Sequence, residues 1–416
     1  DACAMTGTSD DGSDIHVPLP YIESDEEEEG GRPALSPPSA ESVLLEELLR
    51  VLALGGSPPA GVADAAESLL DQCFWASLAE TEGLHVLGSK CAEADAHWKA
   101  VSPHAPRRDS VPSLRASLDA RGYITPAMLP SCEEPAVLKA LCRMCRRLRS
   151  HGFAPVWIFI FDEAWHVLRS SWISLAAALQ FEPGDLVLEP SMFAHSLTRP
   201  RDPLSPELMA DADNTKDGNV ELARYSYVGG NFGIPHRDHS SADCFDSGGN
   251  PTLFSLWVPL NDVTFDNGAI HVVPKEFDEF FTKPDSPKHL LPFDQNSRRV
   301  HFEVGAAVAL APCNAGVPLA WHGSLIHWGG ACSSFTESEP RISLTASLRV
   351  AGSPSTMLKD QLAVRRDLQF ADLLALDLAD RVGYIAGSLL IYQWWFGLGS
   401  GVLPGDFKAL LDLGRG

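Results

Sequence analysis

Three side chains in this sequence have the types and the spacing to bind one metal ion together. His236 and Asp238 form an H-x-D motif within "GIPHRDH", residues 233–239. Side chains two residues apart in an extended segment point to the same side, so one imidazole and one carboxylate can reach a single ion. His327, in "SLIHW", is the candidate for the third ligand. Two histidines and one carboxylate on one face of an octahedral iron leave its other positions open for a co-substrate and dioxygen.

A positively charged side chain follows the third candidate ligand along the sequence. Arg341 lies fourteen residues after His327, at the start of the strand-like run "RISLTASLRV". A keto-diacid bound to iron needs a cation for its far carboxylate, and arginine can bind a carboxylate through two parallel hydrogen bonds. The order of an H-x-D motif, a distant histidine and then an arginine is more specific than any of its parts. It predicts a metal site that also holds a keto-diacid.

The sequence around these residues resembles the phytanoyl-CoA dioxygenase family of Fe(II)/2-oxoglutarate oxygenases. Members typically carry the pattern W-x-x-L-x-D-x-T-x-x-N-G-x-x-x-V-x-P between the H-x-D motif and the distal histidine. The matching positions are Trp257, Leu260, Asp262, Thr264, Asn267, Gly268, Val273 and Pro274. The resemblance covers roughly residues 220–350. It implies that His236, Asp238 and His327 are the iron ligands and that Arg341 holds the far carboxylate of 2-oxoglutarate.

Two other stretches are similar to further 2-oxoglutarate oxygenases. The run "YSYVGGNFGIPHRD" resembles the strand before the H-x-D motif in prolyl 4-hydroxylases, and it places Tyr227 nine positions before His236. The triplet that begins at Arg341 matches the R-x-S of other members, which implies that Ser343 hydrogen-bonds the same carboxylate. Tyr227 and Trp257 are candidates for contacts with 2-oxoglutarate, with packing in the core as the alternative.

The resemblance implies a dioxygenase that uses Fe(II), 2-oxoglutarate and O2. Such an enzyme would hydroxylate an unactivated C–H bond of a small molecule while 2-oxoglutarate is decarboxylated to succinate and CO2. The carboxylate of Asp238 favours hydroxylation, because halogenating members carry a small residue at this position. Three alternatives stay open: a prolyl-type protein hydroxylase, a cupin-like metalloenzyme that does not use 2-oxoglutarate, and a catalytically silent barrel that acts as an interaction protein.

The elements that must position these residues change in type along the chain. Residues 1–40 are expected to be a disordered acidic tail, and residues 41–150 are expected to be mainly helical. Many short strand-like runs between turn signals, at 151–352, predict a mainly β core of the double-stranded β-helix type, a jelly-roll or cupin-like barrel. Within it, the apolar run 154–162 reads as a buried strand. Residues 353–416 are expected to be a C-terminal helical extension.

Composition limits the partners of the protein. The net charge is −23, which argues against binding to nucleic acid or to an anionic membrane. Residues 382–405 carry no charge over 24 positions, long enough to span a bilayer, but their glycines, glutamine and proline favour a buried helix and turn. We therefore expect a small-molecule substrate and no membrane partner.

The cysteines and the start of the chain bear on its compartment. Nine cysteines, an odd number at irregular spacing, do not form the disulfide framework of a secreted protein. No signal peptide is visible, and the chain does not begin with methionine. An intracellular location is expected, in the cytoplasm or in an organelle after removal of a targeting segment.

Overall fold

The computed structural model describes residues 40–87, 111–199, 235–355 and 367–392, apart from short gaps at residues 56, 60, 126–128, 130, 132, 291, 295–298, 331 and 334. Tyr227 and nearly all of the acidic tail lie outside the described residues.

The larger of the antiparallel sheets has five strands in the order β10-β1-β9-β2-β7. These strands are β10 (Leu368–Gln369), β1 (Leu186–Ser196), β9 (Ile342–Val350), β2 (Leu253–Pro259) and β7 (Leu319–His322). All neighbouring strands in it run antiparallel. Phe193, Thr345 and Trp257 lie in one row across β1, β9 and β2, and the next row on the same face contains His195 opposite Ser343.

A smaller sheet has the order β6-β3-β8. Its strands are β6 (Val308–Ala309), β3 (Ile270–Val272) and β8 (His327–Gly329). A single antiparallel bridge between His236 and His327 attaches the H-x-D segment to β8. A two-stranded hairpin, β4 (Phe293–Asp294) and β5 (Arg299–Val300), lies apart from both sheets.

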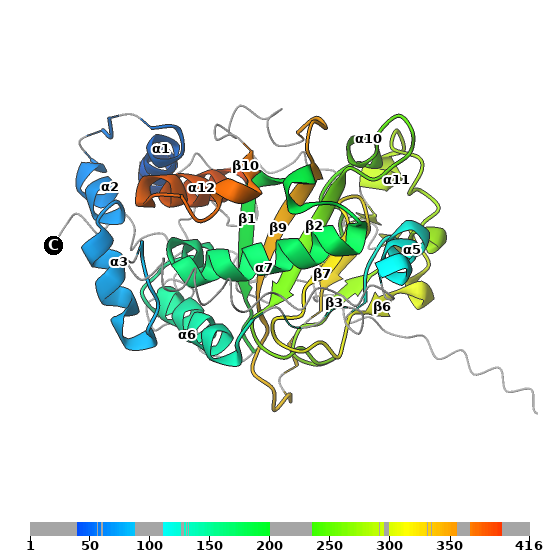
Figure 1. Ribbon diagram of the computed structural model, residues 1–416, viewed down its shortest axis with the longest axis horizontal. Coiled ribbons are helices and arrows are strands. Elements are labelled where there is room, and N and C mark those ends of the chain that lie inside the picture. The colour runs from blue at the N-terminus through cyan, green and yellow to red at the C-terminus, as the bar shows by residue number, and fades with distance from the viewer. Residues whose placement is uncertain are drawn as a thin grey trace, which may run out of the picture.

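Helices cover the larger sheet. The longer ones are α1 (Ala40–Leu54), α5 (Val111–Arg121), α6 (Pro135–Ser150), α7 (Asp162–Leu179) and α12 (Leu378–Ile391). The shorter ones are α2 (Ala63–Leu69), α3 (Gln72–Ala79), η1 (Glu80–Glu82), η3 (Pro155–Ile160), η4 (Pro183–Asp185), α10 (Ser241–Cys244), η5 (Lys275–Phe277), α11 (Pro287–Leu290), η6 (Val304–Ala306) and η8 (Phe370–Asp372). The long helix α7 crosses the larger sheet and contacts β2, while α12 packs against α1 and β1 (Figure 1).

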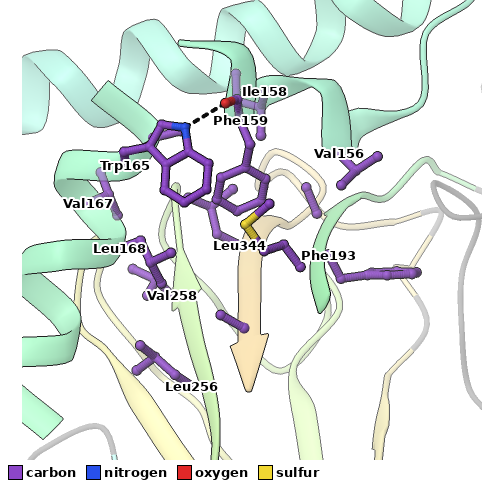
Figure 2. Close-up of a cluster of buried hydrophobic side chains, with 14 of the residues drawn as sticks. Val156, Ile158, Phe159, Trp165, Val167, Leu168, Phe193, Leu256, Val258 and Leu344 are labelled. Atoms are coloured by element: carbon purple, nitrogen blue, oxygen red, sulfur yellow. Dashed lines mark hydrogen bonds between the residues drawn. The ribbon is translucent and has the colours of Figure 1, made fainter. Parts of the chain in front are cut away.

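Side chains alternate between the two faces of the larger sheet, and this alternation separates the core from the site. Leu256, Val258 and Leu344 pack beneath α7 and η3, where Trp165 donates a 2.6 Å hydrogen bond to the carbonyl of Phe159 (Figure 2). The residues between them in the sequence, such as Ser255 and Trp257 of β2, point to the opposite face. We call this second surface the inner face of the sheet. One hydrophobic cluster joins the helical regions before and after the strands with the sheet itself.

One expected strand is absent. Residues 155–160 form the 3-10 helix η3, in which every residue is buried, and they do not form the strand expected for 154–162. A continuous apolar run does not distinguish a buried strand from a buried helical turn. Pro155 at the first position favours the helical turn, because it has no amide hydrogen for a strand ladder and its φ angle suits a helix start.

The regions outside the main strands fit the expected helices in part. Within residues 41–150, which were expected to be mainly helical, the structure has the helices α1, α2, α3, α5 and α6. The region after residue 355 contains α12, but it also contributes β10, which pairs with β1. No helix in the described part of the chain is long and apolar enough to cross a membrane.

Candidate metal centre

His236, Asp238 and His327 lie close enough to bind one ion. A ligand atom of each lies within 4.8 Å of the other two, and no other such group occurs in the described ranges. Oδ1 of Asp238 is 3.7 Å from Nε2 of His236 and 3.5 Å from Nε2 of His327. Ligand atoms held about 2.1 Å from an ion at right angles are about 3 Å apart. The two histidine–carboxylate distances are thus slightly longer than in a metal-bound site, and the three side chains would have to move inward to bind an ion.

The backbone places the two histidines side by side. The amide of His236 donates to the carbonyl of His327 at 3.0 Å, and the amide of His327 donates back at 2.9 Å. Residues paired in this way across antiparallel segments point to the same side. The two imidazole centroids are 4.4 Å apart as a result, and Asp238 follows two residues later on the same side.

Hydrogen bonds to neighbouring groups orient two of the three ligands. Nδ1 of His327 lies 3.0 Å from the carbonyl of Leu325, so it carries the proton and leaves Nε2 as a free electron-pair donor. Oδ2 of Asp238 accepts a 2.7 Å hydrogen bond from the hydroxyl of Ser255. Burial opposes ionisation of Asp238, but the neighbouring histidines and this hydrogen bond outweigh it, so the pKa of Asp238 lies below its ordinary value. The carboxylate is therefore ionised at neutral pH, as a metal ligand must be.

Arg237, between the first two ligands, points away from the metal site and is anchored in the interior. Its guanidinium donates to Oδ2 of Asp278 at 2.6 Å, to the carbonyl of Ser324 at 2.5 Å and to the carbonyl of His289 at 2.7 Å. The side chains of Arg237 and Asp278 are only 2% and 1% exposed. The imidazole of His289 in turn accepts a hydrogen bond from the amide of Ser241. These contacts anchor the H-x-D turn on the side that faces away from the candidate metal ligands.

Arg341 is a buried cation, 1% exposed, at the start of β9. Its Nε donates to the carbonyl of Gly268 at 2.5 Å, its Nη1 donates to the hydroxyl of Ser343 at 2.7 Å, and its guanidinium lies 5.6 Å from the ring centroid of Trp257. Burial lowers the pKa of Arg341 to about 10. No carboxylate among the described residues forms an ion pair with it. An unpaired buried charge costs free energy, so we expect an anion to bind beside Arg341.

A glycine permits the close approach of Arg341 to the preceding loop. Gly268 has a φ of +108°, which residues with a side chain rarely adopt. A Cβ atom there would lie 2.3 Å from Cδ1 of Leu197 and 3.4 Å from Nε of Arg341. The neighbouring Asn267 fixes the turn, since its side-chain amide donates to the carbonyls of Asp262 and Glu339.

The remaining residues expected in the site have different positions. Ser343 and Trp257 lie on the inner face beside Arg341, whereas Tyr227 lies outside the described residues. His322, in the sequence "WHGSLIH", is buried near Phe245 and Phe254, and this burial lowers its pKa to about 3. It does not join the candidate metal ligands.

Sequence reasoning missed four residues that contact or surround the site. They are Ser255, Arg237, Asp278 and His195. The alternation of β2 could have indicated Ser255, which lies two residues before Trp257 on the same face. The other three have no local signal, because their neighbours come from distant parts of the chain.

Comparisons with known proteins give structural neighbours only. No family model matches the sequence, and no curated protein matches it, so membership of the phytanoyl-CoA dioxygenase family stays a prediction. Similar solved structures include the non-heme monooxygenase ThoJ in complex with Ni, with 13% identity over 57% of this chain and 77% of that chain and a TM-score of 0.34. Another is the epimerase SnoN in complex with Fe3+, alpha ketoglutarate and nogalamycin RO, with 16% identity over 63% and 95% and a TM-score of 0.36. A third is EvdO2 from Micromonospora carbonacea var. aurantiaca with 2-oxoglutarate, with 15% identity over 59% and 94% and a TM-score of 0.33.

Proposed function

We propose that this protein is an Fe(II)/2-oxoglutarate-dependent oxygenase that hydroxylates an unactivated C–H bond of a small molecule. The observation that carries the proposal is the link between Arg341 and Asp238 along β2. Ser255 hydrogen-bonds Asp238, and Trp257, two residues further, lies beneath the guanidinium. Positions two apart on a strand are separated by about 7 Å. Asp238 and Arg341 therefore contact neighbouring positions on the same face of β2, an arrangement that supports a co-substrate bound by both the metal and the cation.

The same proposal extends to the fold and the family. We infer that the two sheets are the halves of a double-stranded β-helix, with the H-x-D segment as a fourth strand beside β8. The proposed barrel is the domain expected at 151–352, flanked by the helical regions 41–150 and 353–416. A phytanoyl-CoA dioxygenase-like subfamily is part of this proposal, supported by the sequence pattern from Trp257 to Pro274.

The residues of the site each contribute a defined step. Fe(II) held by His236, Asp238 and His327 would supply the activation of dioxygen, with 2-oxoglutarate converted to succinate and CO2. Arg341 would neutralise the far carboxylate of 2-oxoglutarate in a buried position, where a charge-assisted hydrogen bond is strong. A carboxylate at Asp238 occupies the position that a halogenating enzyme leaves open for chloride, so hydroxylation is the outcome we propose.

The test separates metal binding from co-substrate binding. The purified protein is loaded with Fe(II) without oxygen, 2-oxoglutarate is titrated while absorbance is recorded, and succinate is measured after admission of air. We expect His236→Ala to lose both iron and succinate formation. Arg341→Met should keep iron but weaken 2-oxoglutarate binding about 10- to 150-fold, from the loss of about 1.5–3 kcal/mol for a hydrogen bond to a charged group. His151→Ala, at the end of α6, is the matched control.

Other outcomes would favour the alternative functions. A protein that binds no iron would be a silent barrel, and this result would refute the proposal. Iron binding without any affinity for 2-oxoglutarate would indicate a cupin-like metalloenzyme. Succinate formation stimulated by proline-containing peptides and by no metabolite would favour a prolyl-type protein hydroxylase.

A further inference from the structure

Several polar groups on the inner face of the larger sheet have no hydrogen-bond partner. They are Nδ1 of His195, Oγ1 of Thr345 and Nε1 of Trp257, each buried from solvent and unpartnered within the described ranges. Thr345 and Trp257 are directly paired in the register of β9 and β2, and His195 is paired with Ser343. Buried polar atoms of folded proteins are nearly always hydrogen-bonded, so this group indicates a bound polar molecule.

His195 lies on β1 directly opposite Ser343 of β9, the residue whose hydroxyl accepts a hydrogen bond from Arg341. Besides burial, the charges of Arg341 and of the three candidate ligands influence the pKa of its imidazole. Its ring also contacts Phe193, with centroids 4.6 Å apart. Burial lowers the pKa of His195, and the positive charge of Arg341 lowers it further. The imidazole is therefore neutral at neutral pH and can donate one hydrogen bond.

The chemistry of these groups defines the molecule that would satisfy them. Arg341 and the indole of Trp257 can only donate hydrogen bonds, and neutral His195 and Thr345 can each donate one. A region with mainly donors, beside a buried positive charge, selects a molecule rich in acceptor oxygens. A dicarboxylate with a keto group has this composition, whereas a hydrocarbon or an amine does not.

We propose that His195 and Thr345 are two further residues that bind the 2-oxoglutarate co-substrate, by donating hydrogen bonds from β1 and β9 to its oxygens. This inference rests on the proposed function of the same site. It assigns the strand β1, which contributes none of the residues predicted from the sequence, a direct part in the site. It also explains why the polar atoms on this face are left without partners by the protein itself.

The test measures binding of 2-oxoglutarate to the Mn(II)-loaded protein by titration calorimetry, which does not depend on turnover. We expect His195→Phe to raise the Kd for 2-oxoglutarate about 10-fold and Thr345→Val, which keeps the shape of the side chain, to raise it about 3- to 10-fold. The Kd for Mn(II) should stay within about 2-fold of the wild-type value. His195→Gln, which retains a donor, should recover most of the affinity.

His322→Gln is the matched control, because it also changes a histidine of the same sheet. Its partner across the strands is Phe254, which precedes Ser255 and therefore faces away from the inner face. Unchanged 2-oxoglutarate affinity in folded His195→Phe and Thr345→Val, with loss in Arg341→Met, would overturn this inference and leave the proposed function intact. Absence of 2-oxoglutarate binding by the wild-type protein would instead overturn the proposed function, and this inference with it.

Discussion

Arg237 should contribute both to the stability of the fold and to metal affinity, because it anchors the turn that carries the candidate ligands His236 and Asp238. Arg237→Met would leave Asp278 as a buried charge without a counter-charge, and the carbonyls of Ser324 and His289 would lose their donor. Breaking a buried ion pair by removal of one partner costs about 3–5 kcal/mol. Loss of a group that hydrogen-bonds a metal ligand lowers metal affinity about 10- to 100-fold, and we take this as the upper limit for Arg237, which anchors the turn between two ligands.

The double variant Arg237→Met with Asp278→Leu distinguishes the loss of the ion pair from the cost of leaving Asp278 buried without its counter-charge. It removes both charges, so we expect it to be less destabilised than Arg237→Met alone, which a double-mutant cycle in urea unfolding would measure. Metal affinity should remain weakened in both variants, because the turn that carries His236 and Asp238 has lost its anchor. Unfolding free energies within about 1 kcal/mol of wild type, together with an unchanged Kd for Mn(II), would refute this reasoning.

Three further predictions concern a glycine, a buried carboxyl and a hydroxyl. Gly268→Ala should destabilise the fold by about 1–3 kcal/mol, because of its positive φ and the overlap with Leu197, and should also weaken 2-oxoglutarate binding; urea unfolding and calorimetry would show both effects. Glu133 is 8% exposed, and burial raises its pKa to about 8. Between its ordinary pKa and pH 8, Glu133 is protonated in the native state but ionised in the unfolded state. The free energy of unfolding should therefore fall as pH rises through this window, by at most about 1.4 kcal/mol per pH unit. Glu133→Gln should remove this pH dependence, which urea unfolding at pH 6 and pH 8 would measure. Ser255→Ala should raise the pKa of Asp238 and shift metal binding to higher pH, whereas an unchanged pH profile of the Kd for Mn(II) would contradict the assigned role of this hydroxyl.

Two of the longer strands could be predicted from the sequence. The runs that contain β2 and β9 have branched and aromatic residues between turn signals, and both are confirmed as strands. Residues 155–160 were mistaken for a strand, because full burial removes the periodicity that distinguishes the two structures. The four-residue strand β7 was missed, since its run "LAWH" is too short to show a pattern.

The candidate site was predictable where its residues form a motif or match the family that the sequence resembles. His236 and Asp238 belong to one H-x-D motif, and Arg341 follows fourteen residues after His327. The ion pair of Arg237 with Asp278 joins residues about forty positions apart, and no sequence pattern indicates it. His195 reaches the site through the pairing of β1 with β9, and such a register is set by tertiary structure rather than by adjacent residues.

The C-terminal helix has a consequence for any shortened form of this protein. The pairing of β1 with β9 is interrupted between Leu188 and Met192, and the amide of Met192 donates instead to the hydroxyl of Ser388 in α12, at 2.9 Å. A chain cut at the expected boundary, residue 352, would therefore leave a buried amide unsatisfied just before the segment that carries His195. It would also expose the edge of β1 that pairs with β10. An exposed strand edge can pair with a strand of another molecule and lead to aggregation. A shortened form of this protein should be designed to retain residues up to at least 392.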